Sequence, residues 1–124
     1  MLELLAPAGN LDAVIAAVQN GADAVYMGFG DGFNARRSAD NFTRESFAKA
    51  VRYCHIRGCK VYVTLNTLVG DREMEAAAAL AQQASDAGAD AILVQDLGLA
   101  RVLRDALPDI PLHASTQMSI HNLA

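Results

Sequence analysis

The stretch Asn20-Gly21-Ala22-Asp23-Ala24-Val25-Tyr26 occurs a second time, almost unchanged, as Ala87-Gly88-Ala89-Asp90-Ala91-Ile92-Leu93. Each copy joins a glycine, which tolerates the left-handed backbone at the end of a helix, to a short apolar run typical of a buried strand. The sequence therefore predicts the same helix-to-strand turn twice in one chain. Repetition of this turn favours a barrel, in which every β/α unit is built alike, over a doubly wound sheet.

Short apolar runs alternate with segments of helical periodicity on both sides of these turns. We expect five strands, at Leu2–Ala6, Ala24–Met27, Lys60–Leu65, Ala91–Val94 and Pro111–Ala114. The helices between them are predicted after the cap residue Asn10, from Thr43 to the turn at Gly58, from Asp71 to Ala87 and from Asp96 to Leu107. Strands apolar on both faces, joined by helices, predict a parallel sheet in an α/β architecture.

The number of units sets a limit on this architecture. Five units of roughly 25 to 30 residues match the size of a barrel unit, but a closed barrel needs eight. We therefore expect a TIM-barrel-like (β/α) fold, here an incomplete barrel of about five β/α units. Residues 1–124 would be the N-terminal portion of this domain, and the remainder of the barrel and a C-terminal region would be absent. An open sheet exposes an edge strand and its inner face, which predicts a homo-oligomer.

Composition excludes several classes of protein. Of the 124 residues, 52% are hydrophobic and 19% charged, which is typical of a packed domain rather than a disordered chain. The net charge of −4 makes the chain as a whole a weak binder of nucleic acid, although this charge is compatible with a local basic patch on its surface. Its apolar runs are far shorter than the roughly 20 residues that span a bilayer. These features predict a cytoplasmic protein with no membrane partner.

Polar residues follow the predicted strands, and the active site of an α/β barrel lies at the carboxyl ends of its strands. The candidates at these ends are Asn10, Gly28, Arg36, Asn41, Asn66, His113, Ser115 and Gln117. Each also has a plainer interpretation. Asn10 fits a helix cap, Gly28 fits a turn, and Arg36 is as typical of a solvated loop as of an anion clamp. His113 and Ser115 are weak catalytic candidates, because a lone histidine is more often structural and two residues this close in sequence do not by themselves make a catalytic triad.

The two cysteines do not indicate a metal site. Cys54 and Cys59, with His55 beside the first, match no zinc-binding spacing and lie toward the opposite rim of the predicted barrel. We expect structural thiols, no metal ligand and no cofactor bound by this chain.

Five blocks carry a resemblance to a known family. They are Leu4–Asn10, Gly21–Tyr26, Asn41–Thr43, Lys60–Asn66 and His113–Gln117. Their order and spacing resemble those of the collagenase-like peptidases, peptidase family U32, over essentially the whole chain. The resemblance implies a TIM-barrel-like domain and a pocket drawing on the strand-end candidates and on Tyr26. The catalytic residues stay unknown, because the family's catalytic type is unassigned.

The resemblance leaves three functions open. The first is proteolysis by a collagenase-like hydrolase acting on peptides, in which this chain alone would be inactive. The second is hydroxylation of an RNA base, with the small molecule prephenate implicated, or a role in oxygen-independent ubiquinone synthesis. Members of that kind carry an iron–sulfur cluster in the full-length protein, on cysteines that Cys54 and Cys59 do not match. The third is a non-catalytic piece that self-associates.

Overall fold

The computed structural model describes residues 3–28, 44–65, 74–94 and 97–114, and in them strands alternate with helices. The strands are β1 (Leu5–Pro7), β2 (Ala24–Met27), β3 (Lys60–Leu65), β4 (Ala91–Val94) and β5 (Leu112–Ala114). The helices are α1 (Leu11–Gln19), α2 (Arg44–Ile56), α3 (Met74–Asp86) and α4 (Leu97–Ala106). All strand pairs are parallel, and the sheet order β1-β2-β3-β4-β5 follows the chain, so the α/β class with a parallel sheet is confirmed.

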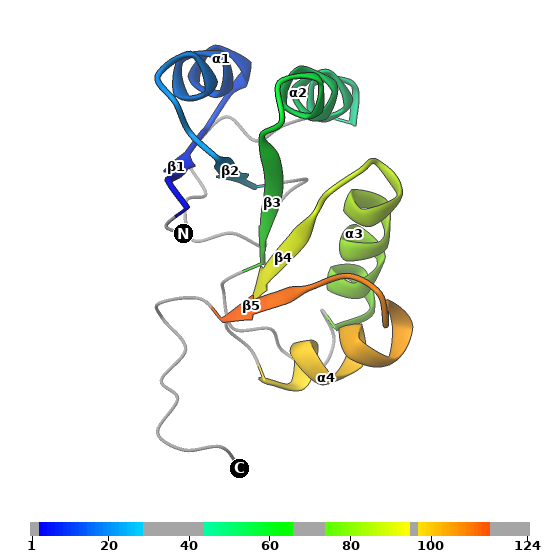
Figure 1. Cartoon of the computed structure of the whole chain (residues 1–124). Coiled ribbons are helices and arrows are strands. Elements are labelled where there is room, and N and C mark those ends of the chain that lie inside the picture. Colours follow the sequence, from blue (N-terminus) through cyan, green and yellow to red (C-terminus); the bar gives the residue numbers. More distant parts are fainter. Residues whose placement is uncertain (1–2, 29–43, 66–73, 95–96, 115–124) are drawn as a thin grey trace.

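The four helices lie on one side of the sheet, and the strands fan around a helix-free side (Figure 1). Alternation along each strand explains this asymmetry, because successive side chains point to opposite faces. Val25, Met27, Val61 and Val63 pack against α1 and α2, whereas Leu65, Ile92 and Val94 pack against α3 and α4. The intervening residues, among them Tyr26, Tyr62 and His113, belong to the helix-free face.

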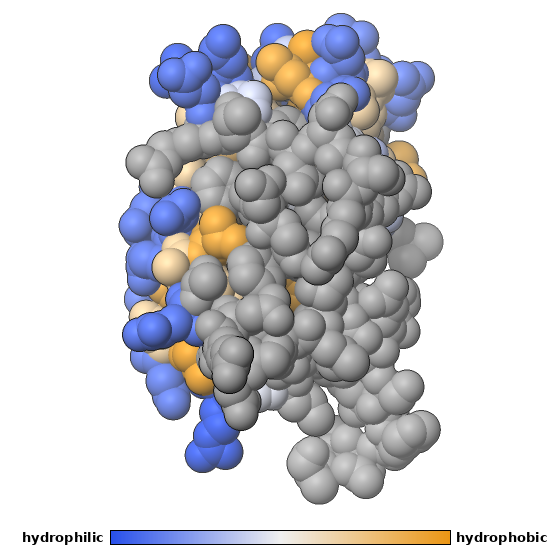
Figure 2. Space-filling view, turned by 180° about the vertical axis from the view of Figure 1, so that it is seen from behind, coloured by the Kyte–Doolittle hydropathy of each residue, from blue (hydrophilic) through white to orange (hydrophobic). Residues whose placement is uncertain are grey.

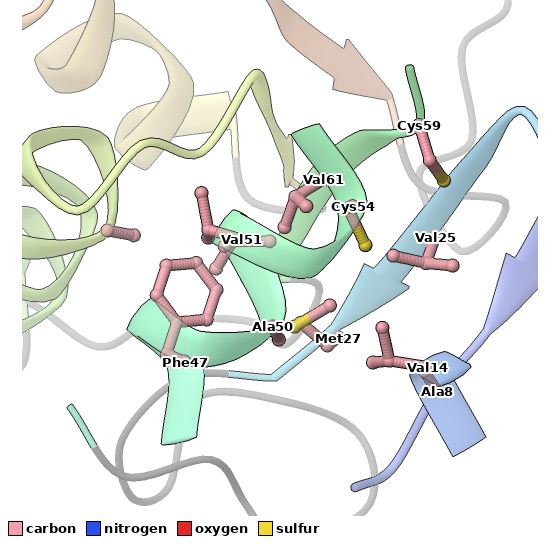
Figure 3. Close-up of a cluster of buried hydrophobic side chains, with 12 residues drawn as sticks. Ala8, Val14, Val25, Met27, Phe47, Ala50, Val51, Cys54, Cys59 and Val61 are labelled. Atoms are coloured by element: carbon pink, nitrogen blue, oxygen red, sulfur yellow. The ribbon is translucent and has the colours of Figure 1, made fainter. Parts of the chain in front are cut away.

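The core beneath α2 is drawn in Figure 3. Phe47, Ala50 and Cys54 are fully buried, at the three- and four-residue spacing that forms one face of a helix. Burial of a side chain the size of Phe47 contributes about 1.5 to 3 kcal/mol. The Cys54 and Cys59 side chains lie beside Val25 of β2, which accounts for both thiols as core residues (Figure 3).

The turn that the sequence repeats is built the same way at three helix ends. Gly21, Gly58 and Gly88 have φ values of 94°, 72° and 111°, the left-handed region that favours glycine. At each end the backbone N–H after the glycine donates to a carbonyl five residues earlier, the Schellman arrangement. The residues these bonds join are Ala17 with Ala22, Cys54 with Cys59, and Ala84 with Ala89.

The aspartate of the repeat fixes the register of neighbouring strands. The Asp23 N–H donates to the Leu4 carbonyl at 2.8 Å, and the Leu4 N–H donates to Asp23 Oδ2 at 2.8 Å. Asp90 makes the same reciprocal pair with Val61, at 2.7 and 2.8 Å. Asp90 Oδ2 also lies 2.8 Å from Nε2 of His55, which joins the end of α2 to the start of β4.

Two details of the predictions were wrong. The first strand begins at Leu5 rather than Leu2, and it includes Pro7, which was expected to end it, because β1 is an edge strand of this sheet and an edge tolerates a residue with no N–H to donate. The strands are not apolar on both faces either, since Lys60 and His113 are exposed. The remaining strands and α4 agree with the predictions to within a residue; the predicted starts of the second and third helices, Thr43 and Asp71, lie outside the described residues.

Candidate functional site

The candidate site lies on the helix-free face of the sheet. It extends from Glu3, which precedes β1, through Tyr62, which is level with the first residue of β4, to His113, which is level with Thr64 and Leu93 nearer the carboxyl ends of the strands. Parallel pairing sets Tyr26 of β2 opposite Tyr62 of β3, and Leu93 of β4 opposite His113 of β5. Tyr62 is almost fully buried among Ala24, Ala91 and these neighbours. The face therefore has an aromatic and apolar floor, with the exposed His113 at its β5 end.

Tyr62 connects this floor to two ionisable side chains. The rings of Tyr62 and His113 meet edge to face, with centroids 5.0 Å apart and planes 76° apart. The Tyr62 hydroxyl donates to the carboxylate of Glu3, whose two oxygens lie at 2.9 and 3.0 Å. Glu3, Tyr62 and His113 thus form a contiguous group across β3 and β5, and the Glu3 carboxylate holds the phenol ring that His113 contacts.

The environment of Tyr62 keeps its phenol neutral. Desolvation by burial, followed by the hydrogen bond to the Glu3 carboxylate, raises the pKa of Tyr62 to about 12. At neutral pH the phenol is a hydrogen-bond donor and not a base or nucleophile. Of this group, His113 is the side chain that is exposed, and an imidazole can both donate and accept a hydrogen bond.

The other predicted site residues in the described part of the chain lie at β1 and β2. Asn10 is the N-cap of α1, and its Oδ1 accepts from the Ala13 N–H at 2.8 Å, so the plainer interpretation of this residue is confirmed. Tyr26 is partly exposed on the helix-free face, and Gly28 directly follows β2. Binding of substrate by these residues stays a prediction.

Five further candidates fall outside the described residues. They are Arg36, Asn41, Asn66, Ser115 and Gln117. The structure therefore does not bear on the proposed pairing of Ser115 with His113.

Neither cysteine belongs to this site. Cys54 and Cys59 are buried on the helix side of the sheet, and burial raises the pKa of both thiols, that of Cys54 to about 12. A thiol with so high a pKa is a poor nucleophile and a poor metal ligand. Within the ranges that the structure describes, no three His, Cys, Asp or Glu side chains are grouped to hold a metal ion.

Sequence reasoning missed Glu3 and Tyr62. Tyr62 sits in a strand with apolar neighbours, so its spacing alone indicates core. Its partners are 59 residues before it and 51 after it, and only the pairing of strands brings them together. One signal in the sequence could have found Tyr62. Side chains alternate between the two faces of a strand, so Tyr62 lies on the face opposite to Val61 and Val63.

Comparison with known proteins gives a family and several relatives. The model of peptidase family U32 matches residues 9–124. The chain is 43% identical to the 23S rRNA 5-hydroxycytidine C2501 synthase of Escherichia coli, over 98% of the chain and 18% of that protein. It is 39% identical to tRNA hydroxylation protein P1 of Bacillus subtilis, over 97% of the chain and 28% of that protein. It is 35% identical to a collagenase of Porphyromonas gingivalis, over 97% of the chain and 28% of that protein.

The chain thus spans less than a third of the length of these relatives. A solved structure of phosphonopyruvate hydrolase, a TIM-barrel-like enzyme, superposes with a TM-score of 0.62 at 20% identity, covering 91% of the chain and 45% of that protein. At this identity the likeness concerns the fold alone. Among the described helices, none has the length and apolar character needed to cross a membrane.

Proposed function

The chain belongs to peptidase family U32, and from this membership we propose that it is the barrel-forming part of a protein that hydroxylates a base in RNA. The observation that carries the proposal is the identity of 43% and 39% to two proteins named for RNA hydroxylation, each over nearly the whole chain. The collagenase shares 35% over the same span.

The helix-free face supports this substrate class. Tyr26 and Tyr62 lie opposite each other in register, and the His113 ring rests on Tyr62. An aromatic and apolar floor, in which Tyr26 is the partly exposed ring and Tyr62 is buried, together with an exposed imidazole suits a planar heterocycle such as a base, which stacks on aromatic surfaces. In this proposal Tyr26 and the floor orient the base and exclude water, and His113 donates or accepts a proton at a ring or exocyclic atom. Asn66, Arg36, Asn41, Gly28 and Gln117 are proposed to complete the pocket.

Proteolysis is the second candidate, favoured by the collagenase and by an uncharacterized protease of Methanocaldococcus jannaschii at 36% identity. It requires a nucleophile beside a base. In the described ranges the Tyr62 phenol stays neutral and both thiols are buried with raised pKa values, so none of the three serves as that nucleophile. For a hydrolase, the candidates named from the sequence are Ser115 and His113.

We propose that the five-stranded sheet is an open part of a (β/α) barrel. A sheet order that follows the chain, with helices on one face only, is the arrangement that closes into a barrel when further units are added. Further β/α units of a longer polypeptide would cover the helix-free face; the chain by itself would do so through self-association as a homo-oligomer. A cytoplasmic location belongs to the same proposal.

An iron–sulfur cluster, which the family resemblance implies for longer relatives, does not fit the described residues of this chain. Cys54 and Cys59 face the core, and their thiols are held protonated. Other cysteines would have to hold such a cluster.

Deletion of the gene that encodes this chain tests the proposal. Digested ribosomal and transfer RNA from the deletion strain, compared with the parent strain by mass spectrometry, should lack one hydroxylated nucleoside. Casein and gelatin zymograms of the two strains should be the same. Unchanged nucleosides together with a lost proteolytic band would overturn the proposal in favour of the peptidase.

A further inference from the structure

The positive charge of this acidic chain is concentrated in one helix and the turn after it. Residues 44–60 contain five of the ten Lys and Arg residues and one of the fourteen Asp and Glu residues. This segment therefore carries +4, the whole chain carries −4, and the remaining residues carry −8. Such an asymmetry within a small domain marks a surface that attracts a polyanion.

The cationic side chains of α2 share its outer face. Lys49 and Arg52 are exposed, and their spacing to Tyr53, Ile56 and Arg57 places all five side chains on neighbouring positions of that face. In the part of the chain that the structure describes, no carboxylate pairs with Lys49, Arg52 or Arg57. We call these five residues, 49, 52, 53, 56 and 57, the α2 basic face.

One arginine on this face is held in place. The guanidinium carbon of Arg57 lies 3.7 Å from the centroid of the Tyr53 ring, and Arg57 Nη1 donates to the Tyr53 carbonyl at 3.1 Å. A guanidinium fixed in this way loses less side-chain entropy on binding, and its planar fork matches a phosphate. Beside it, Ile56 is 73% exposed and offers an apolar contact for a sugar or a base.

We propose that the α2 basic face binds the phosphate backbone of RNA. The proposal rests in part on the proposed function, because it names the surface that holds the RNA whose base is modified. The charge, the fixed guanidinium and the nearby apolar contact are the features expected of such a surface. A membrane fits less well, because a membrane-bound helix inserts its apolar face, and the apolar face of α2 is buried in the core.

Figure 2 shows one face of the molecule, where hydrophilic residues predominate over the described surface and hydrophobic patches lie between them.

The other described arginines provide a matched control for α2. Arg101 on α4 is exposed, as Arg52 is, and it has no carboxylate partner among the described residues. Replacement of either arginine by glutamine removes one charge from the surface of a helix.

The test measures binding of the purified chain to a fluorescein-labelled RNA hairpin by fluorescence anisotropy at several salt concentrations. We expect Lys49→Gln/Arg52→Gln to weaken binding about tenfold at low salt and to reduce the slope of log Kd against log salt by about 1.4 to 1.8, since two phosphate contacts are lost. Arg52→Gln alone should weaken binding by about threefold, and Arg101→Gln should leave it within twofold. Circular dichroism confirms that each variant is folded.

Two results would overturn the proposal: no binding of RNA by the wild-type chain, or equal weakening by Arg52→Gln and Arg101→Gln. If RNA is not bound and the double variant loses binding to phosphatidylserine vesicles, the surface binds a membrane instead. The proposed function is tested separately. A deletion strain that lacks a hydroxylated nucleoside, together with RNA binding that does not depend on α2, refutes only the α2 basic face. Unchanged nucleosides refute the proposed function.

Discussion

Replacement of Gly88 by alanine should destabilise the chain more than the same change at Gly21, although both glycines end a helix in the repeated turn. Both have positive φ, 111° and 94°, so an alanine at either site costs about 1 to 2 kcal/mol in backbone strain. The sites differ in their surroundings. A Cβ at Gly88 would lie 2.8 Å from Cγ1 of Val51 in α2, whereas a Cβ at Gly21 has no atom within 4 Å.

The close contact at Gly88 adds an overpacking cost of about 1 to 3 kcal/mol. We therefore expect Gly88→Ala to lower the free energy of unfolding by about 2 to 5 kcal/mol and Gly21→Ala by about 1 to 2 kcal/mol. The gain from a less flexible unfolded chain is the same for both changes and cancels in the comparison. Urea unfolding followed by circular dichroism at 222 nm measures both values.

Val51→Ala provides the control. In the Gly88→Ala background it removes the clashing methyl groups, so the two changes together should cost less than the sum of their separate effects. Equal losses at Gly88 and Gly21, or strict additivity of Gly88→Ala and Val51→Ala, would refute the packing of α2 against the turn before β4.

Three further predictions concern single side chains. Asn10→Ala removes the cap of α1 and should cost about 1 kcal/mol in unfolding free energy, while Asn10→Ser retains most of it; equal losses would contradict the cap. The Tyr62 pKa is raised from 10 to about 12, so its stabilising contribution is complete below pH 10 and is lost as pH rises toward 12. Alkaline melting curves should show this loss in the wild type and not in Tyr62→Phe, and absorbance at 295 nm should show one of the three tyrosines titrating late; a single transition near pH 10 would contradict it. Cys54 should resist a disulfide reagent at pH 8 until urea unfolds the chain, because its thiol is buried with a pKa of about 12; rapid reaction of both thiols in the native chain would show that the core is open.

The fold was predictable from the sequence because its signals are local. The glycine that ends a helix, the asparagine that begins one and the alternation within a strand each act within a few residues. The repeated Gly-Ala-Asp identified the turn, and the three glycine-ended helices confirm it. The bonds from Asp23 and Asp90 back to the preceding strand were not predictable, because they depend on which strands pair.

The candidate site was predictable only in part for the same reason. The rule that active sites follow strand ends selected His113, and the helix-cap pattern anticipated what Asn10 does. Glu3 and Tyr62 are brought to His113 by tertiary pairing alone, so no spacing indicates them. The uneven distribution of charge around α2 is visible in the sequence, but the buried side of the helix had to be known before its basic side could be identified.

The central claim is that the strand-end site around His113 serves hydroxylation of RNA. The most direct measurement is the amount of the hydroxylated nucleoside in a deletion strain that carries either the wild-type gene or the His113→Ala gene, with both proteins present at equal levels. The account predicts that the wild-type gene restores the nucleoside and that His113→Ala, which changes an exposed side chain, restores less than a tenth of it. Full restoration by His113→Ala, or none by the wild-type gene, would contradict the account.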